Sequence, residues 1–569
     1  MRQRETILFI QLPYLDNHVG GPSENLRLAA NYLVCAMERA GEDRYFKPQI
    51  LTPSADRLDD VSLVKLITER KCPAVIVATI YLWNVERTLD VLDKVKKRLP
   101  SVRILIGGPE VAADHPVLFK SGVANVISIG EGEQVFPVIL ECLRKKINCD
   151  LVGVASKKQG VYEWGKVQRP EIELSEILPG PRFRLNKPDG NGVAYMETSR
   201  GCPMKCTFCC YNQKRNGVSF LQTHEVVNRV AILLRRGAEE IRFVDPTFNS
   251  NPDFESILRG LIKLNPARKI RFFAELRAET VTGEQASMLD KANFREIEVG
   301  VQSRDKSVLK AIRRPAKLSA LDRGVKLMSG RRIRLTVDIM CGLPFQQISD
   351  IRKSLKWAFM LKNAHVQFLH ALLIPGTELR DKRRLLGLKC QNKPPYRVLS
   401  TKWMSESAVQ DAERMALSYA GRLMDSPAGS FCGKSLPDLF EERICIDTSS
   451  PFSMIIPGVT NRRAILMEGA GLYKDRDRIC SIINAAITGE PNILWQFVLT
   501  PKSEEPLDLL DFMIAAIDRH PLHFLDNMTI HPDGYRRAAR RIFVLLCPGY
   551  KFSNSWLDAV ESHLRSYFY

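Results

Sequence analysis

Long apolar runs are missing from this sequence: no stretch of about 18 consecutive apolar residues, the length that spans a membrane as a helix, occurs in the chain. An export signal is not expected either, because the charged residues 1–5 lead straight into a short strand, Thr6–Gln11. The fourteen cysteines are scattered and do not form a disulfide framework. We therefore expect a chain without a membrane span, in a reducing cytoplasm where thiols stay available to bind metal.

Basic charge is plentiful, but no recognised RNA-binding module accompanies it. The net charge is +19. A helix is predicted over Tyr535–Leu546, and the densest basic group lies along one side of it: Arg536, Arg537, Arg540 and Arg541. A solvated helix face explains that group better than an anion-binding patch does. We do not expect nucleic acid as a partner, and the charge slightly favours an anionic substrate.

Changes of pattern along the 569 residues indicate several domains, since one domain typically has about 100–200 residues. An apolar share of 45% is enough for a core in each of them. We predict a first region at 1–150, a linker rich in proline and glycine at 151–190, a central region at 191–380 and a last region at 381–569.

Three cysteines stand in one short stretch at C-x3-C-x2-C: Cys202, Cys206 and Cys209, with the aromatic Phe208 just before the last. Three thiolates on one loop can hold a [4Fe–4S] cluster and leave its fourth iron open to a substrate or cofactor. A structural zinc site needs four ligands, often as paired C-x2-C units, and the chain has no second such pair. Cys210 allows a C-x3-C-x3-C spacing instead, but Phe208 favours Cys209 as the third ligand.

This motif and its setting resemble the radical S-adenosylmethionine (SAM) enzymes. The resemblance implies that the open iron chelates the amino and carboxylate groups of SAM. An electron from the cluster would then cleave SAM to a 5′-deoxyadenosyl radical. An electron donor such as flavodoxin or ferredoxin is implied as a partner.

The first region alternates short apolar strands with amphipathic helices, which predicts an open parallel sheet with helices on both faces. Strands are expected at Thr6–Gln11, Ala74–Thr79, Arg103–Ile106 and Val126–Ile129. Glycine-containing loops follow the last two strands, at 107–110 and 130–133. Ligands of such sheets bind at the carboxyl ends of the strands, where glycine lets the backbone approach closely.

This order resembles the cobalamin-binding domain in front of many radical SAM enzymes. The resemblance assigns cobalamin contacts to both glycine loops and to the end of a buried strand: Thr79, Gly107, Gly108, Gly130, Glu131 and Gly132. An ordinary flavodoxin-like domain whose glycines only turn corners is the alternative. His18, in a D-x-H-x-x-G pattern, is a candidate cobalt ligand or a loop residue near the corrin edge. The loop Tyr81–Asn84 could instead place an aromatic or apolar side chain beneath the cobalt.

Six alternations of strand and helix in the central region suggest a partial (β/α)6 barrel with chemistry at the carboxyl ends of its strands. The strands are expected at Ala194–Thr198, Glu240–Val244, Ile270–Leu276, Glu296–Val301, Leu335–Met340 and His365–Leu373. The whole region resembles the radical SAM core.

That resemblance assigns SAM contacts to residues on and after the strands. The loop from Asp245, which includes Thr247, would meet the SAM amino group, and Arg277 its carboxylate. Glu298 and Gln302 look like the polar groups that meet the ribose or methionine. Gly342 lies in the turn expected near the adenine. Salt-bridge partners at strand ends are the alternative for the charged members.

The last region is expected to be mostly helical, with helices at Ser407–Met424 and Leu507–Arg519. It shows no metal-ligand spacing, phosphate loop or catalytic triad. In related enzymes, the region after the barrel shapes the substrate pocket, and this is an analogy only.

Together these features predict an α/β protein. An open, doubly wound, Rossmann-like parallel sheet for cobalamin is followed by a partial (β/α)6 radical SAM barrel and a mostly helical C-terminal domain. The chain resembles the cobalamin-dependent radical SAM methyltransferases, which implies that a first SAM methylates cobalamin. A second SAM would generate the radical that activates an unactivated carbon of a small-molecule or peptide substrate.

Three alternatives stay open. The first is a cobalamin-dependent radical SAM cyclase or oxidase that does not methylate. The second is a methylthiotransferase, although Cys35, Cys72 and Cys142 do not match the spacing of its additional cluster. The third is a non-catalytic cobalamin sensor, against which the intact cysteine motif argues.

Overall fold

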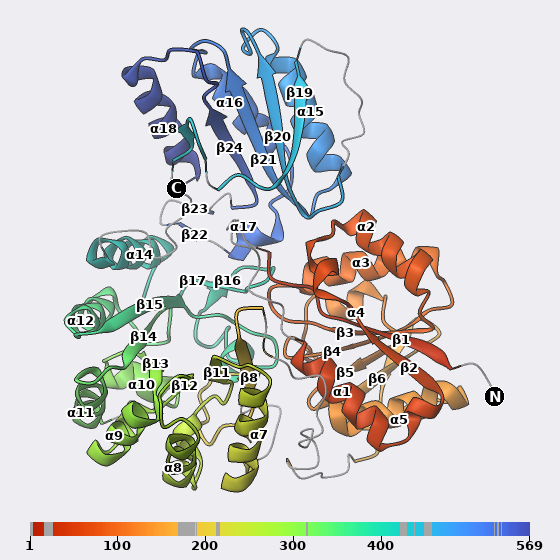
Figure 1. The fold of residues 1–569 in the computed structure, drawn as a ribbon, viewed down its shortest axis with the longest axis vertical. Helices are drawn as coiled ribbons and strands as arrows, with labels where there is room; N and C mark the ends of the chain where they lie inside the picture. Colours follow the sequence, from red (N-terminus) through yellow and green to blue (C-terminus); the bar gives the residue numbers. More distant parts are fainter. Residues whose placement is uncertain are drawn as a thin grey trace.

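Three large β-sheets, each covered by helices, form the centres of the computed structural model of the chain, and the part that the structure describes also contains three two-stranded sheets (Figure 1). The structure describes residues 4–15, 27–168, 174, 188, 190–211, 217–314, 317–420, 430–436, 438–448, 458–528, 530–531, 534–535 and 538–568. No helix within these ranges is both long and apolar enough to cross a membrane.

The first sheet has the strand order β2-β1-β3-β4-β5-β6-β7. Its strands are β1 (Glu5–Ile10), β2 (Phe46–Ile50), β3 (Val75–Thr79), β4 (Arg103–Gly107), β5 (Val126–Ser128), β6 (Val154–Lys158) and β7 (Val161–Trp164). The first five strands run parallel, as predicted, and the β6–β7 hairpin adds antiparallel strands at one edge. The sheet therefore extends beyond residue 150.

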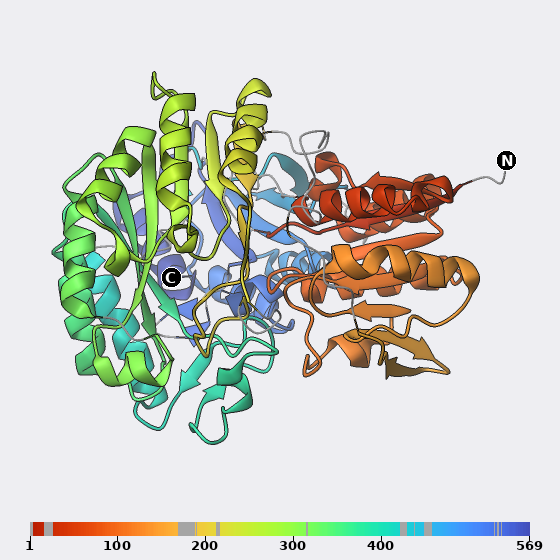
Figure 2. The same cartoon turned by 90° about the horizontal axis from the view of Figure 1, so that it is seen from below.

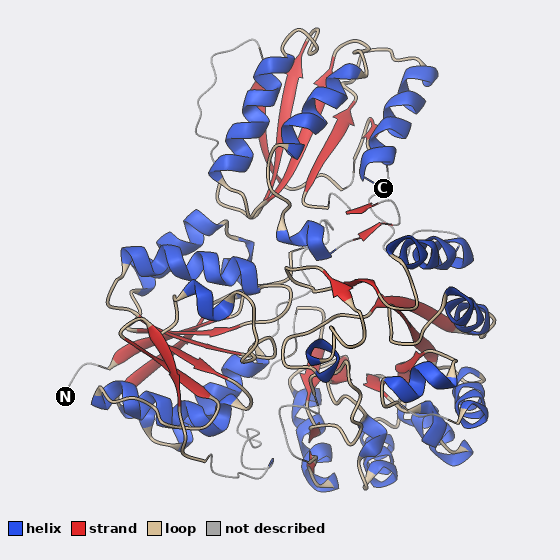
Figure 3. Ribbon diagram, turned by 180° about the vertical axis from the view of Figure 1, so that it is seen from behind, coloured by secondary structure: helices blue, strands red, loops and turns tan. Residues whose placement is uncertain are grey.

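Helices cover both faces of this sheet because its parallel strands are apolar throughout. One core cluster joins the sheet to α2 (Asp60–Lys65) and α3 (Val85–Arg98). Another joins its other face to α1 (Leu28–Arg39) and α5 (Gly132–Lys145). The doubly wound arrangement is confirmed, and Figure 3 shows the two helical layers.

The second sheet is six-stranded and entirely parallel, with the order β15-β14-β13-β12-β11-β8. Its strands are β8 (Val193–Met196), β11 (Glu240–Phe243), β12 (Arg271–Glu275), β13 (Phe294–Gln302), β14 (Arg334–Cys341) and β15 (Ala364–His370). Its helices are α7 (Thr223–Arg235), α8 (Phe254–Leu264), α9 (Gly283–Ala292), α10 (Lys306–Ala311), α11 (Leu318–Ser329) and α12 (Ile348–Phe359). They line the outside of the curved sheet (Figures 1 and 2), which confirms the partial barrel.

Strict alternation along the barrel strands decides which side chains face outward. On β13, Ile297, Val299 and Val301 lie in the core cluster between the sheet and its helices. On β14, Leu335, Val337 and Ile339 belong to the same cluster. Because side chains alternate along a strand, the residues between them, which are mostly polar, lie on the inner face of the barrel.

The C-terminal region contradicts the prediction that it is mostly helical, because a five-stranded parallel sheet forms its centre. The strand order is β18-β24-β21-β20-β19. Its strands are β18 (Cys432–Gly433), β19 (Glu442–Asp447), β20 (Arg462–Gly469), β21 (Leu494–Pro501) and β24 (Arg540–Leu545). The helices are α14 (Glu406–Ala420), α15 (Arg476–Gly489), α16 (Asp508–Asp518) and α18 (Asn554–Phe568). The α14 and α16 helices match the predicted ones.

The prediction of a helix over Tyr535–Leu546 was wrong. Residues 540–545 form the inner strand β24, which pairs with β18 and β21. Arg540 and Arg541 are 3% and 7% exposed, so they do not form a solvated face. Arg540 Nη1 donates instead to the Pro521 carbonyl at 2.8 Å. Arg536 and Arg537 lie outside the described residues.

The first and third sheets are joined by buried polar contacts. Arg463 of β20 pairs with Asp59, and each side chain is 2% exposed. Asn492 donates to Asp60 at 2.8 Å and to Asp90 at 2.7 Å. These contacts hold the C-terminal sheet against the α2–α3 side of the first sheet.

Candidate active site

The stretch with the three cysteines lies at the carboxyl end of β8, between the two short strands β9 (Ser199–Arg200) and β10 (Ser219–Phe220). Asp245, the second residue after β11, fixes its start. The fully buried carboxylate of Asp245 accepts hydrogen bonds from the Thr198 amide at 3.0 Å and the Ser199 hydroxyl at 2.5 Å. Burial raises the pKa of Asp245 to about 7, although those hydrogen bonds oppose the shift. In this position, Asp245 orients the residues that lead into the cysteines.

Polar side chains reach two of the three thiols. Arg314 Nη1 donates toward Cys206 Sγ at 3.7 Å, and Thr247 Oγ1, which donates to the Pro246 carbonyl at 2.6 Å, lies 3.7 Å from Cys202 Sγ. The Cys209 amide donates to the Cys206 carbonyl at 3.2 Å, which closes the loop. Burial, assisted by the neighbouring thiols, raises the pKa of Cys209 to about 12. A donor such as Arg314 stabilises a metal-bound thiolate.

The donor set fits an iron–sulfur cluster better than a single metal ion. Within the described ranges, no three His, Cys, Asp or Glu side chains are placed to hold one ion. A [4Fe–4S] cluster instead takes thiolates at separate corners of a cube, and Cys202, Cys206 and Cys209 lie on one loop with polar side chains beside two of them. These residues would hold the cluster.

Arg277 and Gly342, two of the SAM candidates, lie at the carboxyl ends of the barrel strands. Arg277 follows β12 by two residues, and its guanidinium pairs with Glu279. Its backbone amide donates to Asn249 Oδ1 at 2.9 Å, which ties Arg277 to the loop after β11. Gly342 directly follows β14 with φ +85°, and a side chain there would lie 3.2 Å from Val398.

Glu298 and Gln302, the remaining SAM candidates, belong to β13. Glu298 lies on the inner face and hydrogen-bonds to Asp338 of β14. Gln302 ends the strand with φ +65°, at an irregularity in the β13–β14 register. The assignment of all these residues to SAM stays a prediction.

The cobalamin candidates lie where the carboxyl ends of β3, β4 and β5 meet. Thr79 ends β3 and is 6% exposed. Gly108 has φ +120°, and a Cβ there would lie 2.5 Å from the Ile80 carbonyl, so the fold itself requires glycine. Ser128 Oγ, on the last residue of β5, is buried without a hydrogen-bond partner. An unsatisfied hydroxyl between two glycine loops suits a polar ligand at this edge. His18 lies outside the described residues.

Glu131 and Glu133 of the second glycine loop face the cluster loop. Arg200, two residues before Cys202, lies 3.0 Å from Glu133, 2.8 Å from Glu197 and 3.9 Å from Glu131. All four side chains are at most 15% exposed. Gly130 has φ +86°, and a Cβ on Gly132 would lie 3.0 Å from Leu33, so glycine suits both positions at the start of α5. The network links the predicted cobalamin edge to the predicted cluster site.

Two further contacts bring the same edges together. Leu82, after β3, and Phe208, between the second and third cysteines, pack against one apolar cluster. Asp114, after β4, accepts from the Gly376 amide at 2.7 Å and pairs with Arg380 at 2.9 Å. The loops of the first sheet thus abut the mouth of the barrel.

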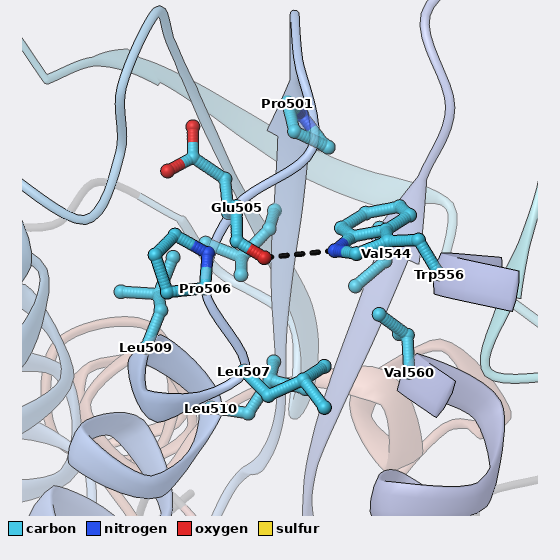
Figure 4. A pocket seen from close by; sticks show the side chains of 10 residues that line it. Pro501, Glu505, Pro506, Leu507, Leu509, Leu510, Val544, Trp556 and Val560 are labelled. Atoms are coloured by element: carbon cyan, nitrogen blue, oxygen red, sulfur yellow. Dashed lines mark hydrogen bonds between the residues drawn. The ribbon is translucent and has the colours of Figure 1, made fainter. Parts of the chain in front are cut away.

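The C-terminal sheet has an apolar cavity at the carboxyl end of β21 (Figure 4). Trp556 Nε1 donates to the Glu505 carbonyl at 2.8 Å across it. Its lining is mostly leucine, valine and proline, so it is a packing gap of the core and lacks groups for chemistry.

Sequence reasoning missed Arg200, Arg314, Glu275 and Asp338. The alternation of β12 and β14 could have shown that Glu275 and Asp338 face inward, because apolar residues flank each of them in sequence. Arg200 and Arg314 carry no such signal, since their partners are distant in the chain.

Comparisons with known proteins agree with this geometry. The family model described as B12 binding domain matches residues 26–140, and that of the Radical SAM superfamily matches residues 196–358. The chain therefore carries a B12-binding domain followed by a radical SAM domain. The cofactors of these domains are cobalamin, a [4Fe–4S] cluster and SAM, as predicted.

Curated relatives match about half of the chain. An uncharacterized methyltransferase of Pyrococcus horikoshii is 24% identical over 291 residues, which cover 49% of this chain and 62% of the relative. The cobalamin-dependent radical SAM methyltransferase TokK of Streptomyces tokunonensis is 26% identical over 302 residues, covering 49% of this chain and 44% of TokK. Thus the chain spans roughly half the length of these relatives.

A solved structure shares the fold over a larger part of the chain. The cobalamin-dependent SAM radical enzyme OxsB, with aqua-cobalamin and SAM bound, superposes with a TM-score of 0.58 at 16% identity. The match covers 73% of this chain and 67% of OxsB. At that identity the likeness shows the fold alone.

Proposed function

We propose that the protein is a cobalamin-dependent radical SAM enzyme that methylates an unactivated carbon of a small-molecule or peptide substrate. The observation that supports this most is the ion pair between Arg200 of the cluster loop and Glu133 at the edge of the first sheet where cobalamin is predicted; Leu82 and Phe208, from the same two edges, pack against one shared apolar cluster. Enzymes that combine two cofactors need their binding edges to meet.

The chain's own residues would position the cofactors and exclude water. Arg314 donates toward the Cys206 thiolate, Thr247 lies beside Cys202, and Asp245 orients the start of their loop. The apolar cluster with Leu82 and Phe208 shields the junction from solvent. When bound, the cluster and SAM supply hydrogen abstraction and cobalamin supplies the methyl group.

The cellular compartment of the enzyme and its electron donor are part of the same proposal. None of the fourteen cysteines forms a disulfide, which fits a reducing compartment such as the cytoplasm. The cluster needs an electron for each SAM cleavage, and a flavodoxin or ferredoxin is a suitable donor.

The test uses SAM carrying a deuterated methyl group. Holoprotein, hydroxocobalamin, a chemical reductant and this SAM are incubated without oxygen, and the cobalamin and nucleoside products are analysed by mass spectrometry. We expect the deuterated methyl group on cobalamin and formation of 5′-deoxyadenosine. Formation of 5′-deoxyadenosine with no label on cobalamin would contradict methyl transfer and favour a non-methylating enzyme. Absence of both labelled cobalamin and 5′-deoxyadenosine would favour a non-catalytic cobalamin sensor.

A further inference from the structure

Two elements at the surface of the barrel hold the cysteine loop from either side of Thr207, the residue after Cys206. The Thr207 amide donates to the Ile312 carbonyl at 3.1 Å, and Ile312 directly follows α10. The Leu379 amide donates to the Thr207 carbonyl at 2.9 Å, and Leu379 lies in the short helix α13 (Glu378–Asp381). One hydrogen bond therefore links each element to the backbone beside a candidate cluster ligand.

Both elements have a buried apolar side and an exposed basic side. Leu309 of α10 and Leu379 of α13 belong to the apolar cluster against which Phe208 of the cysteine loop packs. Lys306 and Lys310, four residues apart, share the opposite, exposed face of α10. The exposed cations of the two elements and of the residues that follow them are Lys306, Lys310, Arg313, Lys382 and Arg384.

The acids beside these cations do not balance them. Asp305 caps α10 by accepting from the amides at its start. Glu378 pairs with both Arg313, at 2.7 Å, and Lys382, at 2.6 Å. Asp381 is exposed, but one carboxylate cannot offset the remaining positive charge. Within the part of the chain that the structure describes, three cations have no ion-pair partner: Lys306, Lys310 and Arg384.

We propose that this surface, formed by residues 306–313 and 378–385, binds a negatively charged electron-donor protein. Uncompensated positive charge attracts such a partner and steers its approach. Leu385, which is 69% exposed beside the cations, offers it an apolar contact. The inference rests on the proposed function, in which the cluster takes up one electron for each SAM cleavage.

The position of the surface favours an electron donor over other acidic partners. Electron transfer between proteins slows steeply with distance, and both parts of the surface touch the backbone next to Cys206. In the transfer, the donor is oxidised by one electron and the cluster is reduced by one, and no bond forms or breaks. The surface also gives part of the net charge of +19 a role other than attraction of an anionic substrate.

The test measures binding of the reconstituted holoprotein to a flavodoxin of net negative charge by isothermal titration calorimetry. Cationic cytochrome c and a single-stranded RNA serve as comparison probes. We expect flavodoxin to bind, cytochrome c not to bind, and the flavodoxin Kd to rise when salt is raised from about 50 mM to about 300 mM.

Charge variants of the two parts of the surface locate the binding. Lys306→Gln/Lys310→Gln and Lys382→Gln/Arg384→Gln should each raise the flavodoxin Kd about five-fold or more, because each removes two attractive charges. The matched control is Lys263→Gln/Lys291→Gln, an equal charge change at exposed positions of α8 and α9, which should leave the Kd unchanged.

The rate of 5′-deoxyadenosine formation separates docking from chemistry. With reduced flavodoxin at a concentration below its Kd, both surface variants should be slower than wild type. With dithionite as the reductant they should match wild type, because a small reductant needs no docking surface.

An unchanged flavodoxin Kd in both surface variants, or cytochrome c binding as tight as flavodoxin binding, would overturn the inference. Weaker RNA binding in these variants with unchanged flavodoxin binding would overturn it too, and would assign the surface to a nucleic acid. Circular dichroism checks that each variant is folded. Failure of the proposed function is seen separately, as absence of label on cobalamin when wild type is reduced with dithionite.

Discussion

At the scale of single residues, the buried acids on the inner face of the barrel, Glu275 of β12 and Asp338 of β14, lower the stability of the fold when they are ionised. Burial, assisted by the neighbouring acids, raises the pKa of Glu275 to about 7 and that of Asp338 to about 8. A carboxyl group whose pKa is higher in the folded state stabilises the fold while it holds its proton, and this contribution is lost as the pH rises through the folded pKa. The ligand-free protein should therefore lose stability between about pH 5 and pH 8.

The substitution Asp338→Asn tests this directly. Because asparagine carries no charge at any pH, the variant should be more stable than wild type at pH 8, by on the order of 1–3 kcal/mol, with a smaller difference at pH 5.5. Thermal unfolding of the ligand-free proteins at both pH values measures the effect. Glu255→Gln is the matched control, since its side chain is 38% exposed. Equal pH dependence in wild type and Asp338→Asn would show that Asp338 does not keep its proton.

At the scale of elements, the sequence indicated the first two sheets far better than the third. Strands and helices of the barrel alternate with clear apolar periodicity, and α8 begins and ends as predicted, at Phe254 and Leu264. The prediction for the residues around β24 failed because an inner parallel strand is apolar on both faces, so its sequence shows no period of two. Arginines at 540 and 541 then suggested a helix face, although the fold buries both.

The cysteine loop could be predicted from the sequence because its three candidate ligands are close together in the chain. Contacts between residues far apart in the chain could not be predicted in this way. Nothing near Arg200 in the sequence shows that Glu133 of α5 will pair with it, because the two are brought together only when the first sheet packs on the barrel. The same holds for Arg314 and Cys206.

The contact between α5 and the cluster loop gives a prediction at this scale. Arg200→Met leaves three acids, Glu131, Glu133 and Glu197, without their shared cation, and should cost about 3–5 kcal/mol. Hydrogen exchange of residues 131–135 and 199–202 should become faster in the variant.

A matched control is Arg259→Met on α8, which removes a pair whose side chains are 56% and 38% exposed. Such a pair contributes about 0–1 kcal/mol. If Arg200→Met were no more costly than Arg259→Met, the network would not hold the two edges together.

At the scale of the whole molecule, the first sheet contacts both the barrel and the C-terminal sheet. Its carboxyl-end loops contact the barrel through Asp114 and Arg200, and its α2–α3 side contacts the C-terminal sheet through Asp59 and Asn492. Figure 2 shows the first sheet beside the barrel. This arrangement predicts that the first and third sheets unfold together.

Arg463→Met should weaken that link by about 3–5 kcal/mol, because it leaves the buried Asp59 unpaired. Differential scanning calorimetry should show a lower first transition or a split one. Lys97→Met, which removes an exposed pair on α3 with side chains 74% and 51% exposed, should leave the calorimetric trace unchanged. A trace for Arg463→Met identical to that of wild type would mean that the sheets are not coupled through Asp59.

The central claim is that one chain holds two cofactors at edges that meet. The most direct measurement is metal analysis and absorbance spectroscopy after anaerobic reconstitution with iron, sulfide and hydroxocobalamin. Wild type should hold about four iron and about one cobalt per chain. The Cys202→Ala/Cys206→Ala/Cys209→Ala variant should lose the iron and keep the cobalt. Iron without cobalt in the wild type would contradict the claim, because the first sheet would then hold no cobalamin.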